Sequence, residues 1–149
     1  MHVESTNQFN TEEHQRLHQL FQRFKDLRAT DHAGAKKVFE EFKAGMERHI
    51  RQEETILFPC YERKCTGSGL IPVDALKWDH GQILNYLDNI ARKLARADFN
   101  TTEEEQNVEA AVDFHSQSEG EQLFPILDEL LTEQERAILF ETLDRCEQV

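Results

Sequence analysis

One pattern of eleven residues occurs twice in the chain, at residues 49–59 and 115–125. Both copies read H-x-x-x-E-x-x-x-L-F-P, so each begins with a histidine that is followed four positions later by a glutamate. On a helix, residues four apart lie on one face with their Cβ atoms about 5–6 Å apart. An imidazole and a carboxylate at that spacing can bind one metal ion together. Because proline fits poorly inside a helix, each copy is expected to end or kink near its last residue.

The second half of the chain repeats the first at an offset of 66 residues, and this offset adds two more histidines to the pattern. It relates three pairs of residues with metal-binding side chains: His14 and His80, His49 and His115, and Glu53 and Glu119. Each half is therefore predicted to be a helical hairpin. The first helix of the hairpin carries one histidine, and the second carries a histidine and a glutamate.

Periodic apolar residues predict four long helices that hold these side chains. The first helix is expected to begin at Asn10 or Thr11, because either side chain can cap a helix. Breaks are predicted in three polar or glycine-containing segments, residues 30–34, 66–72 and 98–102. No stretch alternates as a strand would. The chain is therefore predicted to be all-α, an antiparallel up-down-up-down four-helix bundle.

Two capping boxes mark later helix starts, namely Thr102 with Glu105 and Thr132 with Glu135. The second box opens a short fifth helix, which is predicted to pack on the bundle. The chain then divides into a loose N-terminal segment, a bundle and a C-terminal helix, at residues 1–10, 11–130 and 131–149.

The predicted breaks bring the four histidines to one level of the bundle. In an antiparallel hairpin, two residues lie level when the turn falls midway between them. The midpoints of successive histidines along the chain fall within or directly beside the three breaks. The two glutamates follow their histidines by one helical turn, about 6 Å along the axis. All six side chains are therefore expected to meet.

The expected layer contains His14, His49, Glu53, His80, His115 and Glu119. Taken singly, such a residue is more often a hydrogen-bonded core histidine or a solvated surface pair than a metal ligand. Taken together, four imidazoles and two carboxylates are costly to bury without a cation. The set suits two metal ions, each bound by two histidines, with both glutamates able to bridge. Nitrogen and oxygen ligands without thiolate favour iron, manganese or zinc, and bundle cores of this kind hold di-iron and di-manganese centres.

Three further side chains near the pattern receive other roles. His18 lies four residues after His14 on the same helix face and is an alternative ligand. At the offset of 66 its counterpart is the apolar Leu84, so His14 is preferred and His18 is expected in a pocket or at the surface. Glu54 and Glu121 are expected to face solvent.

Composition limits the partners and the compartment. The net charge of −12 disfavours nucleic acid and anionic membranes as partners. No apolar run approaches the roughly 20 residues of a membrane helix, and the N-terminus lacks the pattern of a signal peptide. Cys60, Cys65 and Cys146 form no CxxC motif, so a cytoplasmic protein with free thiols is expected. A redox role for Cys60 and Cys65 is the alternative.

The paired H-x-x-x-E and L-F-P motifs between His14 and Pro125 resemble the hemerythrin-like (HHE cation-binding) family. The resemblance implies a four-helix bundle with a non-haem di-iron centre, bridged by an oxo or hydroxo group. Manganese and zinc are less expected. It assigns the six residues of the layer as iron ligands. It also implies a small ligand: oxygen, nitric oxide or hydrogen peroxide.

The sequence departs from the oxygen-carrying members in two places. Those members resemble a pattern with His-x-x-x-His on the third helix and His-x-x-x-x-Asp on the fourth. Here Leu84 stands four residues after His80, and Glu119 stands four after His115. The site is more symmetric and more anionic, closer to bacterial relatives associated with nitric oxide, peroxide or iron–sulfur repair. About ten residues precede the first expected helix, too few for the cysteine-containing domain of the repair proteins.

Three functions are compatible with the pattern. The first is a di-iron protein that binds or turns over a small oxidant. The second is a sensor of oxygen or iron, or a metal-binding protein without turnover, working with a protein partner or as a homo-oligomer. The third is a purely structural metal site. No separate general acid or nucleophile is evident, so any chemistry belongs to the metals, and whether the chain is an enzyme stays open.

Overall fold

The computed structural model describes residues 5–65 and 71–147, and within these ranges the chain is helical and contains no strand. The predicted all-α class is confirmed. The elements are α1 (Thr6–Leu27), α2 (His32–Gln52), the π-helical turn η1 (Glu53–Leu57), α3 (Phe58–Lys64), α4 (Val73–Ala95), α5 (Thr102–Gln122), α6 (Phe124–Leu130) and α7 (Glu133–Glu147). No helix in those two ranges combines the length and the apolar character that crossing a membrane requires.

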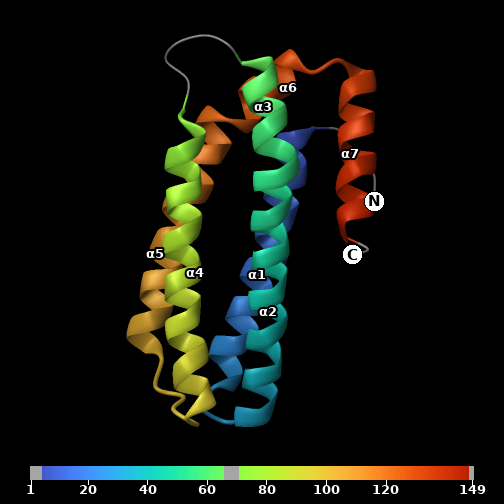
Figure 1. Cartoon of the computed structure of the whole chain (residues 1–149). Helices are drawn as coiled ribbons and strands as arrows, with labels where there is room; N and C mark the ends of the chain where they lie inside the picture. Colours follow the sequence, from blue (N-terminus) through green and yellow to red (C-terminus); the bar gives the residue numbers. More distant parts are fainter. Residues whose placement is uncertain (1–4, 66–70, 148–149) are drawn as a thin grey trace.

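The long helices stand side by side and alternate in direction, as an up-down-up-down bundle requires (Figure 1). α2, η1 and α3 form one continuous rod, and α6 follows α5 after a single residue. α1 packs against α2 and α5, and α4 packs against α5 and α2, which closes the ring of helices. The predicted short C-terminal helix is present as α7, which lies outside the ring against α2 and η1. There Gln52 Nε2 donates a hydrogen bond to the carbonyl oxygen of Leu143 at 3.4 Å.

The first helix begins earlier than predicted. Ser5 is its N-cap, and its side chain accepts a hydrogen bond from a backbone N–H of the first turn. The backbone N–H of Thr6 donates to Asp128 Oδ1 at 2.7 Å. Asn10 and Thr11, the predicted caps, lie inside α1. Part of the predicted loose segment is therefore helical, because a carboxylate on the distant α6 satisfies N–H groups that open the helix.

The other helix boundaries follow the predicted breaks. α2 begins after Asp31, whose carboxylate accepts a hydrogen bond from the backbone N–H of Gly34 at 3.0 Å. α4 ends and α5 begins on either side of the break at 98–102, where Ala97 has a left-handed φ of 59°. The middle break at 66–72 falls mostly outside the described residues.

One of the two predicted capping boxes is confirmed. Glu135 Oε1 accepts from the backbone N–H of Thr132 at 3.0 Å, and Thr132 Oγ1 accepts from that of Glu135 at 3.1 Å. The box predicted at the start of α5 is wrong. Thr101 is the N-cap residue there, and its hydroxyl donates to Glu105 Oε2 at 2.7 Å. Arg28, the C-cap residue of α1, also binds Glu105, with Nε 2.5 Å from Oε2. This contact turns the carboxylate inward instead of toward the helix end.

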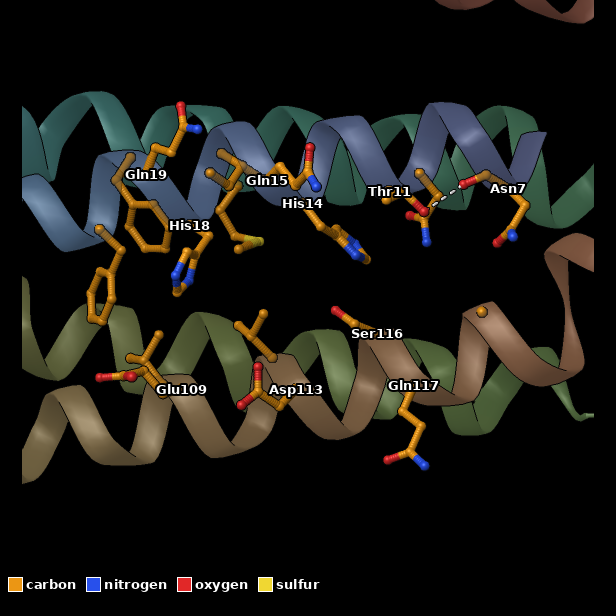
Figure 2. Close-up of a pocket in the computed structure, with 18 residues that line it drawn as sticks. Asn7, Thr11, His14, Gln15, His18, Gln19, Glu109, Asp113, Ser116 and Gln117 are labelled. Carbon is orange, nitrogen blue, oxygen red and sulfur yellow. Dashed lines mark hydrogen bonds between the residues drawn. The ribbon is translucent and has the colours of Figure 1, made fainter. Parts of the chain in front are cut away.

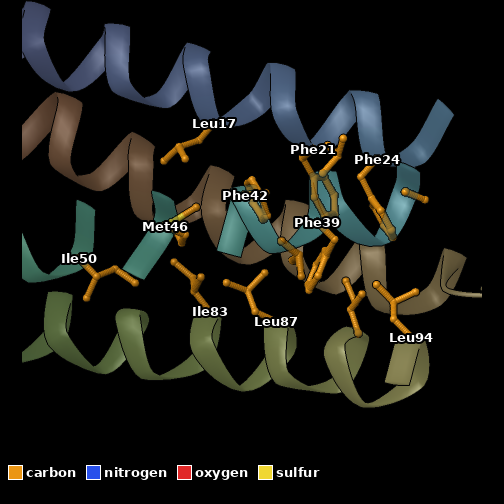
Figure 3. Packing of buried hydrophobic residues seen from close by; sticks show 14 residues of the cluster. Leu17, Phe21, Phe24, Phe39, Phe42, Met46, Ile50, Ile83, Leu87 and Leu94 are labelled. Atoms are coloured by element: carbon orange, nitrogen blue, oxygen red, sulfur yellow. The ribbon is translucent and has the colours of Figure 1, made fainter. Parts of the chain in front are cut away.

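Two apolar clusters fill the bundle, and the predicted metal layer lies between them along the helices. Figure 3 shows the first cluster, which includes Leu17, Phe21, Phe24, Phe39, Phe42, Met46, Ile50, Ile83, Leu87 and Leu94. The second cluster includes Leu57, Phe58, Leu76, Leu123, Phe124, Leu127, Leu139 and Leu143. On α4, for example, His80 stands between Leu76 of the second cluster and Ile83 of the first. The polar layer is thus enclosed by apolar packing on both sides.

Replacing Phe24 by alanine tests the first cluster. Phe24 is 0% exposed, so the variant loses its contacts and leaves a cavity. We expect the free energy of unfolding to fall by about 3–5 kcal/mol, as measured by urea denaturation. Phe114→Ala is the matched control, because Phe114 is 65% exposed and its loss should change that free energy by less than about 0.5 kcal/mol. Equal losses of unfolding free energy in the two variants would contradict the placement of Phe24 in the core.

Candidate metal centre

The structure brings all six predicted side chains together in one layer of the bundle. They come from successive helices: His14 from α1, His49 from α2, Glu53 from the start of η1, His80 from α4, and His115 and Glu119 from α5. Two groups are each able to hold a metal ion, namely Glu53, His80, His115 and Glu119, and His14, His49 and Glu119. Within each group the ligand atoms lie within 4.8 Å of one another. Each residue stands in the inward stripe of its helix, so packing of that stripe turns the ligand atom inward.

His80 and His115 form the first histidine pair. Their Nε2 atoms lie 2.9 Å apart. Glu53 Oε1 lies 2.7 Å from His80 Nε2 and 3.4 Å from His115 Nε2. Glu119 Oε1 lies 3.2 Å from His115 Nε2. The ring of Phe58, from the first L-F-P copy, stacks on the His80 ring with centroids 5.5 Å apart, which fixes the plane of the imidazole.

His14 and His49 form the second histidine pair, with their Nε2 atoms 3.3 Å apart. Glu53 reaches this pair through its other oxygen, since Oε2 lies 3.5 Å from His49 Nε2. Glu119 Oε1 lies 3.9 Å from His14 Nε2. Each carboxylate therefore spans both histidine pairs. The His14 side chain is 19% exposed, whereas the other members of the layer are buried.

Several polar atoms of the layer are buried without a hydrogen-bond partner among the described residues. They are Nδ1 of His49, Oε2 of Glu53, and both carboxylate oxygens of Glu119. Burying a carboxylate in this way is costly unless a cation shares its charge. The donor set is nitrogen and oxygen without thiolate, which suits borderline first-row metals. The residues present therefore fit a metal centre.

Crowding of like charges separates the pKa values of the two carboxylates. Burial raises the pKa of Glu119 well above its ordinary value, and the charge of Glu53 raises it further. Burial acts in the same direction on Glu53, but His49 and hydrogen bonds within the layer lower its pKa well below the ordinary value. Two carboxylates at such close range favour one shared proton, which Glu119 holds.

The histidines are also shifted, in opposite directions. Burial, together with the neighbouring His49, lowers the pKa of His14 to about 4. Burial likewise lowers the pKa of His49, against the attraction of nearby carboxylates that include Glu13. Burial also opposes the charged form of His115, but its contacts with the two carboxylates of the layer outweigh burial and raise its pKa to about 11. The His14–His49 pair is therefore neutral at pH 7, as metal ligands must be.

Two outer carboxylates contact the far ring nitrogens of the first pair, and the sequence reasoning did not assign either of them. Glu54 Oε2 lies 2.7 Å from His80 Nδ1, and Asp79 Oδ2 lies 3.3 Å from His115 Nδ1. Such contacts orient a ring, select its tautomer and increase its basicity as a ligand. For Asp79 the signal in the sequence is an acidic residue directly before His80.

The expectation that Glu54 faces solvent is wrong, and the π-helical turn η1 accounts for the error. In an α-helix adjacent side chains diverge by about 100°, which predicts that Glu54 points away from the layer. A π-helical turn holds more residues, so it rotates less per residue. The Glu54 side chain accordingly stays beside His80 and is 35% exposed. Glu121 is exposed, as expected.

The two L-F-P copies interrupt the α-helix as predicted, but in different ways. The first passes through η1 into α3. In the second, α5 stops, the backbone turns at Leu123 with φ −118° and ψ −64°, and α6 follows. Both prolines occupy the first turn of the next helix, where a missing N–H is tolerated. The leucines and phenylalanines of both copies are 0% exposed and close one side of the layer.

A groove between α1 and α5 reaches the His14 side of the layer (Figure 2). Its volume is about 720 Å³, and its lining includes His14, His18, Ser116 and Gly120. Figure 2 shows the rings of His14 and His18 directed from α1 toward α5. His18 belongs to neither metal-binding group of the described residues. It is a groove residue, in agreement with the assignment to a pocket.

The cysteines give no support to the alternative redox role. Cys60, Cys65 and Cys146 are free. Burial raises the pKa of the Cys60 and Cys65 thiols. A raised pKa favours the protonated thiol, which is a poor nucleophile.

An all-α bundle in which histidines and glutamates converge from four helices defines a class of metal-binding proteins. The family model described as the hemerythrin HHE cation binding domain matches residues 7–127, and the chain belongs to this family. The match includes every residue of the layer. Comparisons with curated proteins and with solved structures give no match. Family membership and the histidine–glutamate layer together identify a metal-binding protein, and the family indicates iron.

Metal binding to the metal-free protein should release protons at pH 7. A ligand must lose its proton to bind a metal ion, and the pKa values of His115 and Glu119 are both raised. We expect release of about two protons per chain. Calorimetric titrations in buffers of different ionisation enthalpy measure this number. Metal binding without proton release would contradict the raised pKa values.

Proposed function

We propose that this chain is a non-haem di-iron protein that binds or reacts with a small oxidant (oxygen, nitric oxide or hydrogen peroxide) at a site of four histidines and two glutamates. The observation that carries the proposal is the placement of Glu53 and Glu119, each within reach of both histidine pairs. Two carboxylates that each face both pairs favour two ions over one. Membership of the hemerythrin family favours iron.

His14 and His49 would hold one ion and His80 and His115 the other, and Glu53 and Glu119 would be within reach of both ions. Bound iron would supply the redox chemistry and the binding of the small ligand. The protein's part is to hold the imidazoles in fixed directions and to keep water from most of the layer. The two apolar clusters support this role because they enclose the layer on both sides.

Two features favour reaction or transient binding over stable oxygen carriage. Leu84 stands where a second histidine of the third long helix would provide another imidazole. With Glu119 on α5, the two buried carboxylates are accompanied by one imidazole fewer than in the oxygen carriers, and a higher proportion of anionic ligands favours the more highly charged, oxidised metal. A centre that stabilises oxidised iron is poorly suited to repeated reversible release of oxygen.

The α1–α5 groove supports access by a small molecule. It reaches His14, the partly exposed member of the layer. Its floor includes apolar side chains such as Leu17, Phe42 and Val112. The apolar floor suits neutral molecules such as oxygen and nitric oxide, and polar side chains such as Asn10, Gln15 and Ser116 line the rest of the groove.

Charge and thiols support a cytoplasmic setting without nucleic acid or membrane partners. The net charge of −12 disfavours polyanions. Free thiols at Cys60, Cys65 and Cys146 fit a reducing compartment. The alternative function, a sensor or a metal-binding protein without turnover, requires a protein partner or a second copy of the chain to transmit its signal.

Metal analysis combined with stopped-flow spectroscopy tests the proposed function. Aerobically purified protein should contain about two irons per chain, and its absorption should change on mixing with oxygen, nitric oxide or peroxide. His49→Ala and His115→Ala should each lose stoichiometric metal, because each removes half of a histidine pair. His18→Ala is the matched control and should keep both ions.

Other outcomes discriminate among the alternatives. Full occupancy by zinc without any spectral response would leave only a structural site. Ligand binding without consumption of the oxidant would favour the sensor. Two ions retained in both His49→Ala and His115→Ala would refute the ligand assignment.

Filling the groove should slow access without removing metal. A Cβ added at Gly120 meets no atom of the described residues within 4 Å, so Gly120→Phe should narrow the groove without a clash. We expect wild-type iron content and a stopped-flow rate with nitric oxide reduced by about tenfold, or ~1.4 kcal/mol of barrier. Gly81→Phe, at an exposed helical glycine with similar free space, should change neither quantity. Equal rates in all three proteins would show that the oxidant enters elsewhere.

A further inference from the structure

At the offset of 66 residues, each ligand of the layer has a counterpart of the same residue type. The residues behind the ligands have counterparts that differ in type or in their contacts. Every ligand of one half has a counterpart of the same type in the other half: His14 and His80, His49 and His115, and Glu53 and Glu119. The repeat therefore supplies an internal reference. Any outer contact present in one half and missing in the other distinguishes two otherwise equivalent metal positions.

The first difference lies at Glu54 and Gly120, which are related by the offset. Glu54 Oε2 contacts His80 Nδ1 at 2.7 Å. Gly120 has no side chain to offer His14, and the space around it is open within 4 Å in the described part of the chain. One imidazole is thus held by an outer carboxylate, and its counterpart faces the groove.

The second difference lies at Asp79 and Glu13, which are also related by the offset. Asp79 Oδ2 lies 3.3 Å from His115 Nδ1. Glu13 is bound instead by Arg16, whose Nη2 and Nε lie 2.7 and 3.1 Å from Glu13 Oε2. His49 Nδ1 is left buried with no hydrogen-bond partner among the residues described.

Arg16 explains why the two acidic residues behave differently. Its counterpart at the offset of 66 is Gln82, which carries no charge. Asp79 therefore has no neighbouring guanidinium three residues later on its helix, and it is free to contact a histidine. Arg16 holds the carboxylate of Glu13 in an ion pair and offsets part of its charge.

We propose that the two metal positions are unequal: the His80–His115 position binds its ion first and more tightly, and the His14–His49 position fills second. The proposal rests on the proposed function only in requiring that metal ions occupy both positions. Arg16 is then a positioning residue, which acts on His49 through Glu13. At limiting metal the chain holds a single ion, bound by His80 and His115.

The outer contacts give the expected size of the difference in metal affinity between the two positions. Loss of an outer hydrogen-bond partner typically lowers metal affinity about 10–100-fold. The first position has two outer carboxylates, Glu54 and Asp79, and the second has neither. The second position also lies beside the groove, where His14 is 19% exposed and water competes for the ion. Both effects act in the same direction.

Anaerobic titration of the metal-free full chain with Co²⁺ tests the inequality, because this ion accepts the same nitrogen and oxygen ligands and its absorption reports each step. We expect two steps separated by at least about tenfold in affinity. His115→Ala should lose the tight step, and His49→Ala should lose the weak step. Loss of the tight step in a folded His49→Ala protein would overturn the assignment.

The outcomes of this titration separate the inference from the proposed function. Binding of no Co²⁺, or of only one ion at saturation, would remove the proposed two-metal centre itself. Two ions bound with equal affinity would leave that centre intact and refute only the inequality. If His115→Ala does not fold, by circular dichroism, His49→Ala and the outer variants still decide the question.

Arg16→Gln introduces glutamine, the residue type of the equivalent position 82. The substitution removes the ion pair with Glu13, and the freed carboxylate can accept a hydrogen bond from His49 Nδ1. The weak step should tighten by about tenfold or more, and the tight step should stay unchanged. Arg23→Gln, the same change two turns further along α1, is the control and should move neither step. An unchanged weak step in Arg16→Gln would refute the role of Arg16.

Glu54→Gln tests the outer contact of the His80–His115 position. It replaces a carboxylate by a neutral amide and should weaken the tight step by about tenfold while the weak step stays in place. Glu121→Gln is the matched control, because Glu121 is exposed on α5. Equal effects of the two substitutions would mean that overall charge, and not the contact with His80, sets the affinity.

Discussion

Burial of two carboxylates among four imidazoles at one level of the bundle is the constraint on which the rest of the structure depends. Such a cluster is unfavourable in an apolar interior unless its charges and lone pairs find partners. The apolar clusters on either side provide the burial that stabilises the fold. The unfavourable groups are confined between them to a single layer. The same helices therefore contribute apolar residues that stabilise the fold at two levels and ligand residues at the level between them.

The near-repeat explains both the regularity of the ligands and the irregularity around them. Ligand atoms must meet at fixed distances, so both halves keep the same residue types in the same stripe. Outside the layer this requirement relaxes, and the halves differ in backbone and charge. The first half contains the π-helical turn and the Arg16–Glu13 ion pair, and the second half contains a break at Leu123 and an open space at Gly120.

The sequence was sufficient to predict the fold and the composition of the layer, because both follow from spacing. Helical periodicity identifies the inward stripe, and turn midpoints determine which residues lie level. The contacts behind the ligands do not follow from spacing. The direction of Glu54 depends on a π-helical turn, and the start of α1 depends on Asp128, which lies 122 residues from Thr6. Glu13 has two candidate partners, and only interatomic distances decide between Arg16 and His49.

The span of the layer along the chain has a consequence for protein synthesis. Its residues extend from His14 in the first helix to Glu119 near the end of α5, and α7, which braces the α2–η1 junction through Gln52, follows them. A chain emerging from the ribosome cannot enclose either carboxylate among its histidines until α5 has left the exit tunnel. Contacts between such distant residues also form slowly during folding. The centre therefore first forms when residues 14–119 are all available.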